Sequence, residues 1–151
     1  FKKAEALSSS EEMISVLCSA MDELVDESDR IRGDRRREAV EAALAYMEKS
    51  YSRDVSVEDI ATSVFLSSRY LNALFREEKG VSVHKALTEI RIRHARRLLS
   101  EAPHMSVTEV AASVGYQTPH SFMRMFKKHV GVAPMSFRRN VARHGTAGEP
   151  R

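Results

Sequence analysis

The feature that most constrains the fold is the stretch at residues 106–137, which has the pattern of two short helices separated by a sharp turn. Small and apolar residues recur at helical spacing up to Val114, and Gly115 follows where a helix commonly ends in a left-handed conformation. Thr118 then supplies a capping hydroxyl. Pro119 follows at the first helical position, where its missing backbone N–H removes no helical hydrogen bond. These residues predict a helix-turn-helix.

The second of these helices, ending near Gly131, has two different faces. Phe122, Met125, Phe126 and Val130 form an apolar face, whereas His120, Met123, Arg124 and Lys127 recur every three or four residues and point outward together. The second helix of a helix-turn-helix enters the major groove of DNA. We therefore expect the basic outward face to meet DNA.

Residues 56–80 repeat this unit about fifty residues upstream, so the chain holds two copies of one supersecondary element. Ser67 or Ser68 is expected to cap the second helix of this copy, and its outward residues include side chains that read base edges. Each of these outward residues, considered alone, is also typical of an ordinary surface helix. The matched residues are Ser56, Val57, Ala61, Ser63, Val64, Phe75 and Gly80 with Ser106, Val107, Ala111, Ser113, Val114, Phe126 and Gly131, and the outward set is Arg69, Asn72, Ala73 and Arg76.

Residues 82–100 predict a long helix between the copies, ending before Pro103 because a residue that precedes proline disfavours the helical conformation. Such a helix is about 28 Å long. One turn of B-DNA is about 34 Å, so two recognition helices held apart by this strut could reach successive major-groove segments on one face of a duplex.

Upstream, residues 11–32 predict a helix with Ser8–Ser10 as capping candidates, and Gly33 with Asp34 is expected to end it before a further helix at residues 35–52. An apolar seam along the first helix could pair with a second copy of the chain, or the helix could be a connector that packs on its own domain. The seam consists of Met13, Leu17, Leu24 and Ile31. We expect a connector or dimerisation segment at 1–34, a globular domain at 35–142 and a disordered tail at 143–151.

Charge is distributed unevenly. Residues 1–34 carry nine acids and four Lys or Arg, a net charge of −5, whereas the part from Ser56 onward carries fifteen Lys or Arg and eight acids, a net charge of +7. The basic excess coincides with the predicted helix-turn-helix units, as expected of a phosphate-binding surface.

Other functions find little support in the sequence. Cys18 is the single cysteine, the histidines lack zinc spacing, and no glycine-rich phosphate loop occurs, so we expect no catalysis, no cofactor and no metal. No apolar run approaches twenty residues, so we expect no membrane span. Cysteine usage fits the cytoplasm. Because the chain begins at Phe1 rather than Met, we expect that a further segment precedes it.

Taken together, the two units, the linking ARRLL helix and the sequence GYQTPHSFMRMFKKHVGVAPMSFR resemble the AraC/XylS family of bacterial transcription regulators over residues 38–140. The motif positions are Gly115, Tyr116, Phe122, Phe126, Gly131, Pro134 and Phe137. The sequence departs from the family pattern at Phe65, where Gly is usual, and at Ala86, where an aromatic residue is usual.

The resemblance implies an all-α fold, a seven-helix domain with two helix-turn-helix units joined by a long linker helix and preceded by an N-terminal connector helix. It implies sequence-specific binding of double-stranded promoter DNA, mainly in activation, with RNA polymerase as a partner. The acidic upstream helix resembles the linker of two-component response regulators of this family, and a sugar-binding cupin is the other common upstream partner. The implied DNA-binding residues are Ser67, Ser68, Arg69, Asn72, Ala73, Arg76, Gln117, Thr118, Pro119, His120, Ser121, Arg124 and Lys127.

The alternative is a helical protein-interaction module that uses the helix-turn-helix only for packing. Such a module would not bind duplex DNA in a salt-sensitive way.

Overall fold

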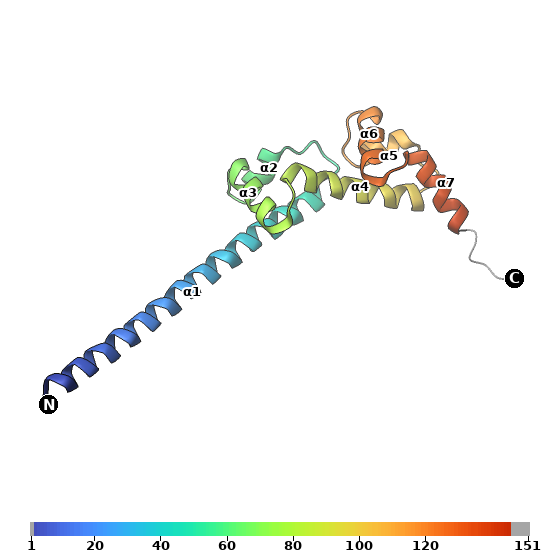
Figure 1. Cartoon of the computed structure of the whole chain (residues 1–151). Helices are drawn as coiled ribbons and strands as arrows, with labels where there is room; N and C mark the ends of the chain where they lie inside the picture. The colour runs from blue at the N-terminus through green and yellow to red at the C-terminus, as the bar shows by residue number, and fades with distance from the viewer. Residues whose placement is uncertain (1, 146–151) are drawn as a thin grey trace. The chain divides into compact units, whose positions relative to one another are not determined.

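The computed structural model describes residues 2–145, with side chains for residues 12–144, and the regular secondary structure of this part of the chain is all α-helix (Figure 1). The chain divides into two compact units, one up to Ala39 and one from Val40 onward. The predicted fold class is confirmed, with α2–α3 and α5–α6 as the two helix-turn-helix units and α4 as the linker. The helices are α1 (Lys2–Ser50), α2 (Val57–Ser63), α3 (Ser68–Lys79), α4 (Val83–Glu101), α5 (Val107–Ser113), α6 (Pro119–Val130) and α7 (Pro134–Gly145).

Helix α1 continues without interruption through Gly33 and Asp34 over its 49 residues. The predicted start near Ser8–Ser10 and the predicted break at Gly33 are therefore wrong. A glycine costs a helix only about 1 kcal/mol relative to alanine, and the neighbouring Arg and Glu residues are good helix formers. The connector and the first helix of the globular unit are consequently parts of one helix.

The first lobe of the second unit consists of α2, α3 and the parts of α1 and α4 that pack with them. Apolar side chains from all four helices are buried here, as the sequence periodicity requires. The buried residues are Val40, Ala43 and Met47 of α1, Ile60 and Ala61 of α2, Leu71, Leu74 and Phe75 of α3, and Val83, Ala86, Leu87 and Ile90 of α4.

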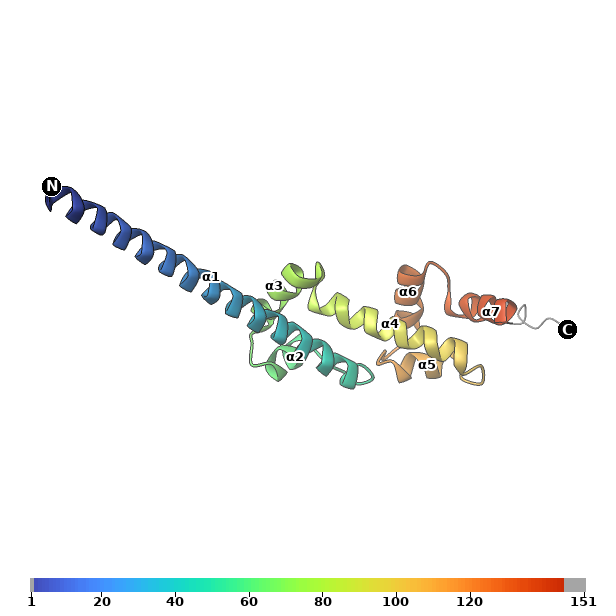
Figure 2. The same ribbon diagram turned by 90° about the horizontal axis from the view of Figure 1, so that it is seen from below.

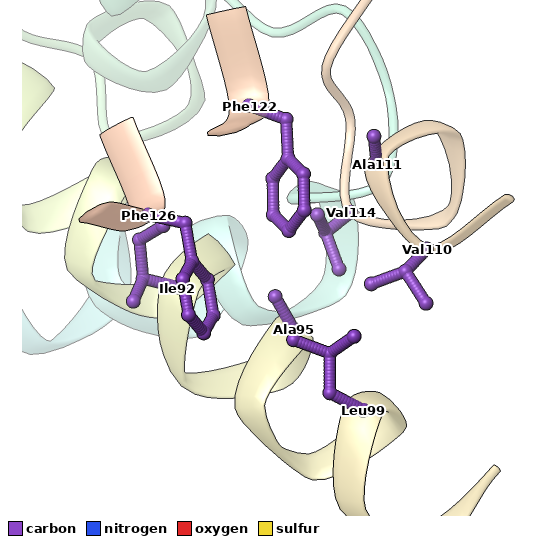
Figure 3. Packing of buried hydrophobic residues seen from close by; sticks show 8 residues of the cluster. All are labelled: Ile92, Ala95, Leu99, Val110, Ala111, Val114, Phe122 and Phe126. Atoms are coloured by element: carbon purple, nitrogen blue, oxygen red, sulfur yellow. The ribbon is translucent and has the colours of Figure 1, made fainter. Parts of the chain in front are cut away.

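The second lobe consists of α5, α6, α7 and the C-terminal half of α4. Its core brings together Ile92, Ala95 and Leu99 of α4, Val110, Ala111 and Val114 of α5, and Phe122 and Phe126 of α6 (Figure 3). Phe126 lies between two other rings, with centroids 5.6 Å from Phe122 and 5.6 Å from Phe137 of α7. Edge-to-face and tilted pairs of this kind stabilise a core beyond simple burial. The pair formed by Phe126 and Phe137 holds α6 against α7.

Helix α4 has 19 residues and lies one residue further along the chain than predicted, with Ser82 as its N-cap. The two lobes lie toward its opposite ends, and Figure 2 shows α3 and α6 on one side of α4 with α2 and α5 on the other. Between residues 2 and 145, no helix is long and apolar enough to cross a membrane.

The C-terminal tail was predicted to begin at residue 143. Residues 143–145 instead form the last part of α7, and the remainder of the predicted tail, residues 146–151, lies outside the described residues.

Candidate nucleic-acid interface

Both recognition helices begin at a capping hydroxyl and end at a left-handed glycine. The Ser67 side chain accepts a hydrogen bond from the backbone N–H of Tyr70 at the start of α3, and the helix ends at Gly80 with φ 70°. At α6 the Thr118 side chain accepts from the N–H of Ser121, Pro119 is the first helical residue, and Gly131 has φ 89°. These caps satisfy donors that a helix start leaves unpaired.

The helices that precede them, α2 and α5, share a capping box. Ser56 and Asp59 bond reciprocally at the start of α2, and Ser106 and Glu109 do so at the start of α5. Hydrogen bonds from Ser56 lower the pKa of Asp59, and those from Ser106 lower the pKa of Glu109. The same local chemistry thus orients both helix-turn-helix units.

The outward face of α3 differs from the prediction at one residue. Arg69, Ala73 and Arg76 are exposed as expected. Asn72 is instead half-buried, and its Oδ1 accepts a hydrogen bond of 3.0 Å from the backbone N–H of Val83. Its acceptor is therefore committed to the start of α4.

The outward face of α6 carries His120, Arg124 and Lys127, all of them exposed. Ser121 is half-buried, and its Oγ accepts a 2.9 Å hydrogen bond from the hydroxyl of Thr118. The structure thus brings the predicted basic residues of this helix onto one open face.

The charges on both faces are available to a ligand. In the part of the chain that the structure describes, none of Arg69, Arg76, Arg124 and Lys127 forms a salt bridge. A duplex could therefore use these cations without breaking an internal pair.

Two predicted residues at the start of α6, Gln117 and Pro119, are also exposed, but Gln117 has a partner elsewhere in the chain. Gln117 donates from Nε2 to Oδ2 of Asp54 over 2.9 Å. Pro119 is exposed at the N-terminus of α6.

Sequence reasoning missed three features of the structure around these helices. Tyr70 on α3 is 45% exposed and Phe65 in the first turn is 97% exposed with φ 58°. Arg91 of α4 is half-buried, and its guanidinium bonds a loop that lies about forty residues away in the sequence. Helical periodicity does not report such long-range contacts, although the departure at Phe65 did mark the first turn as unusual.

The four seam residues of α1 are exposed, with exposed fractions between 44% for Ile31 and 71% for Leu24. Ile14, Met21 and Val25 extend the same apolar stripe. The upstream unit therefore shows a large apolar surface on a single helix, which is the expected state of a helix that requires a partner.

Within the described residues, no group of three or more His, Cys, Asp or Glu side chains could hold a metal ion. The candidate site that the described residues support is the pair of exposed basic faces on α3 and α6.

Comparison with known proteins agrees with this site. The family model described as "Helix-turn-helix domain" matches residues 60–140. The HTH-type transcriptional regulator GlxA of Rhizobium meliloti is 38% identical over 101 residues, which is 67% of this chain and 31% of GlxA. The chain thus spans about a third of that relative.

Three solved structures share the fold. The C-terminal domain of AraT, a response regulator from Geobacillus stearothermophilus, has a TM-score of 0.65 and 36% identity, covering 68% of this chain and 84% of that domain. An AraC-type regulator from Chromobacterium violaceum has a TM-score of 0.66 and 26% identity, covering 70% and 94%. The DNA-binding domain of AdpA, solved with a target DNA, has a TM-score of 0.68 and 25% identity, covering 72% and 97%.

Two helix-turn-helix units on one linker helix, each with an open basic recognition face, define a DNA-binding domain of the transcription-regulator class. The chain belongs to the AraC/XylS family of bacterial transcription regulators. The proteins to which it is similar are named as transcriptional regulators, in agreement with the prediction that this chain is no enzyme.

Proposed function

We propose that this chain binds double-stranded promoter DNA in a sequence-specific way by inserting α3 and α6 into successive major grooves. The observation that carries the proposal is the duplicated unit, because each copy exposes a recognition helix with cations that have no internal salt bridge among the described residues. A packing module would not need such a surface twice.

The length of α4 supports simultaneous binding by both heads. Nineteen residues extend over about 28 Å, close to the roughly 34 Å of one helical turn of B-DNA. Bending the duplex could meet the remaining difference at a cost on the order of 1–6 kcal/mol.

The side chains suggest different roles on the two helices. Arg124, near the middle of α6, is the best candidate for a bidentate base contact. Lys127 and Arg76 are better suited to phosphates, which a flexible cation can reach without exact geometry. Asn72 is a weaker candidate for reading adenine, because its acceptor already bonds Val83.

Similar proteins support the same function. The AdpA domain was solved in complex with a target DNA, and a relative from Staphylococcus xylosus is named as the lactose operon transcription activator. We propose that the protein acts in the bacterial cytoplasm as an activator, with RNA polymerase as a partner. The likeness to AraT supports an upstream receiver domain of a response regulator.

We further propose that α1 mediates homodimerisation. Its seam residues Met13, Leu17, Leu24 and Ile31 are exposed at the heptad-like spacing that coiled coils bury. Changing Leu17 and Leu24 to Ser should reduce the sedimentation mass to that of a monomer. The matched control changes Asp22 and Asp26, on the opposite face, to Asn, and an unchanged mass in the Leu variant would reject the dimer.

The DNA-binding proposal is tested by selecting duplexes from a random pool and measuring affinity by fluorescence anisotropy at several salt concentrations. We expect the selected duplex to bind at least about 10³-fold more tightly than random DNA, with affinity falling steeply as salt increases. A chain that selects no duplex and shows no salt dependence would instead be the protein-interaction module.

A further inference from the structure

Arg91, in the middle of α4, holds the loop that follows α1. Its Nε donates to the backbone carbonyl of Tyr51 over 2.9 Å, and its Nη2 donates to the carbonyl of Arg53 over 2.9 Å. Carbonyls just beyond a helix C-terminus lack helical partners and carry partial negative charge, so a guanidinium suits them. One side chain thus fixes the loop of the first lobe onto the linker helix.

The turn between α5 and α6 contacts the same loop and the same Arg91 side chain. Gln117 donates to Asp54 of the loop over 2.9 Å, and the guanidinium carbon of Arg91 lies 5.7 Å from the centre of the Tyr116 ring. Burial lowers the pKa of Arg91 and raises the pKa of Tyr116, in keeping with their enclosure. The two lobes therefore touch directly, in addition to being joined by α4.

Gly115 shows how close this approach is. A Cβ at Gly115 would overlap the carbonyl oxygen of Tyr51 and lie 3.0 Å from Nη2 of Arg91. The equivalent residue of the first unit is Phe65, which also has positive φ but exposes 97% of its surface. Because that turn accepts a phenylalanine, the turn conformation alone does not require glycine, and it is the contact with Tyr51 that leaves no room for a side chain.

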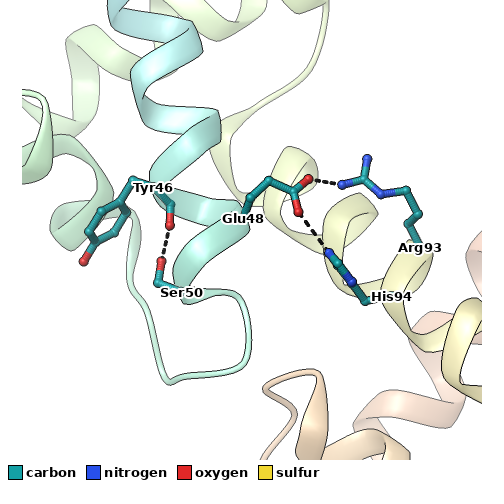
Figure 4. Close-up of polar contacts among 5 residues, drawn as sticks. All are labelled: Tyr46, Glu48, Ser50, Arg93 and His94. Atoms are coloured by element: carbon teal, nitrogen blue, oxygen red, sulfur yellow. Dashed lines mark hydrogen bonds and ion pairs between the residues drawn. The ribbon is translucent and has the colours of Figure 1, made fainter.

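A second set of contacts fixes the end of α1 to α4 nearby. Glu48 accepts hydrogen bonds from Arg93 and from Nε2 of His94, the latter over 2.9 Å (Figure 4). The Tyr51 ring stacks on His94 with centroids 3.9 Å apart and an interplanar angle of 7°. Burial, together with the charges of Arg93 and Arg97, lowers the pKa of His94. The loop is thus anchored on both sides.

We infer that Arg91 is a positioning residue that sets the spacing of the two recognition helices, by clamping the loop Tyr51–Asp54 between α4 and the turn at Gly115–Gln117. A linker helix alone would let the lobes twist and bend about its axis, whereas a second contact beside the helix removes this freedom. This inference rests on the proposed binding of both heads to one duplex. It adds that Arg91, a side chain outside the two recognition helices, specifies the preferred distance between half-sites.

The test compares Arg91→Ala, Arg91→Lys and Gly115→Ala with Phe65→Ala, the matched change in the turn that makes no interlobe contact. Each variant is titrated with a duplex selected from a random pool, with the same duplex lengthened or shortened by one base pair between half-sites, and with a single half-site. Arg91→Ala and Gly115→Ala should lose about tenfold in affinity for the selected duplex, because the second head loses effective concentration. Affinity for the half-site should stay within about twofold, and the penalty for altered spacing should shrink.

Arg91→Lys should fall between the wild type and Arg91→Ala, since one ammonium group cannot bond both carbonyls in the same fork geometry. Phe65→Ala should behave as the wild type. An unchanged spacing penalty in Arg91→Ala would overturn the inference, and so would an equal loss on the half-site and the full site.

A measurement without DNA tests the variants that bind DNA too weakly for titration. With Cys18→Ser as background, spin labels at Glu78→Cys and His129→Cys report the distance between the lobes. The distribution should be narrow with Arg91 and broad with Arg91→Ala, and equal widths would contradict the clamp. Failure of the wild type to bind any duplex would reject the proposed function instead, and leaves this distance readout intact.

Discussion

The amide oxygen of Asn72 on α3 lies 3.0 Å from the backbone nitrogen of Val83, the first residue of α4. This hydrogen bond joins the first recognition helix to the linker helix. It uses a side chain that the sequence predicted to contact DNA.

Replacing Asn72 by alanine should lower the free energy of unfolding by about 1 kcal/mol, since the N–H of Val83 loses its acceptor. Asn72→Asp keeps an acceptor and should lose less. Denaturant titration of both variants measures the difference. Equal stability of Asn72→Ala and the wild type would show that the bond contributes nothing.

The uninterrupted course of α1 gives a second prediction. Gly33 lies inside the helix, and its φ is not positive. Nothing lies within 4 Å of the position that an alanine Cβ would take there. Gly33→Ala should stabilise the helix by about 0.4–1 kcal/mol, because alanine has fewer unfolded conformations to lose. Circular dichroism through a thermal melt should show higher helicity at every temperature, and a drop in helicity would mean that the helix ends at Gly33.

The capping box of α5 gives a pH dependence. Backbone and side-chain hydrogen bonds from Ser106 hold the pKa of Glu109 below its ordinary value, so the folded state favours the carboxylate. The resulting stabilisation is fully present above the unfolded pKa and is lost as pH falls through the lower folded pKa.

The gap in unfolding free energy between the wild type and Glu109→Gln should therefore be constant above about pH 5 and narrow on further acidification. Denaturation at a series of pH values measures it. A gap that widens on acidification would reverse the sign of the effect.

Arg124 and Lys127 lie one turn apart on α6. We expect a substitution at Arg124 to reduce sequence specificity and a substitution at Lys127 to reduce affinity for all DNA. Arg124→Ala should cost about 1–3 kcal/mol on the selected duplex and little on random DNA. Lys127→Ala should weaken both alike and reduce the slope of log affinity against log salt by about one. Anisotropy titrations distinguish the two, and undiminished discrimination in Arg124→Ala would remove it from base recognition.

The elements that sequence predicted well are those with local causes. The limits of α3 and α6 follow from Ser67, Thr118 and the left-handed glycines that end them, and each of these acts within one helical turn. The prediction of a break at Gly33 was wrong, because the weak helix-breaking preference of one glycine does not outweigh a long run of good helix formers.

The site was predictable only where periodicity was enough. Arg124 and Lys127 face outward as their spacing requires, whereas Asn72 turns toward Val83 and Arg91 toward Tyr51. The latter contact joins residues forty positions apart, and no pattern within a helix could report it. Contacts of this kind depend on how the lobes pack and not on the face of one helix.

The most direct test of two-headed binding is a base-resolution footprint of this chain on its selected duplex. Two protected major-groove segments, about one helical turn apart on the same face, are expected. Arg124→Ala should weaken protection of the segment under α6 and leave the other in place. A single protected segment in the wild type would contradict recognition by both helix-turn-helix units.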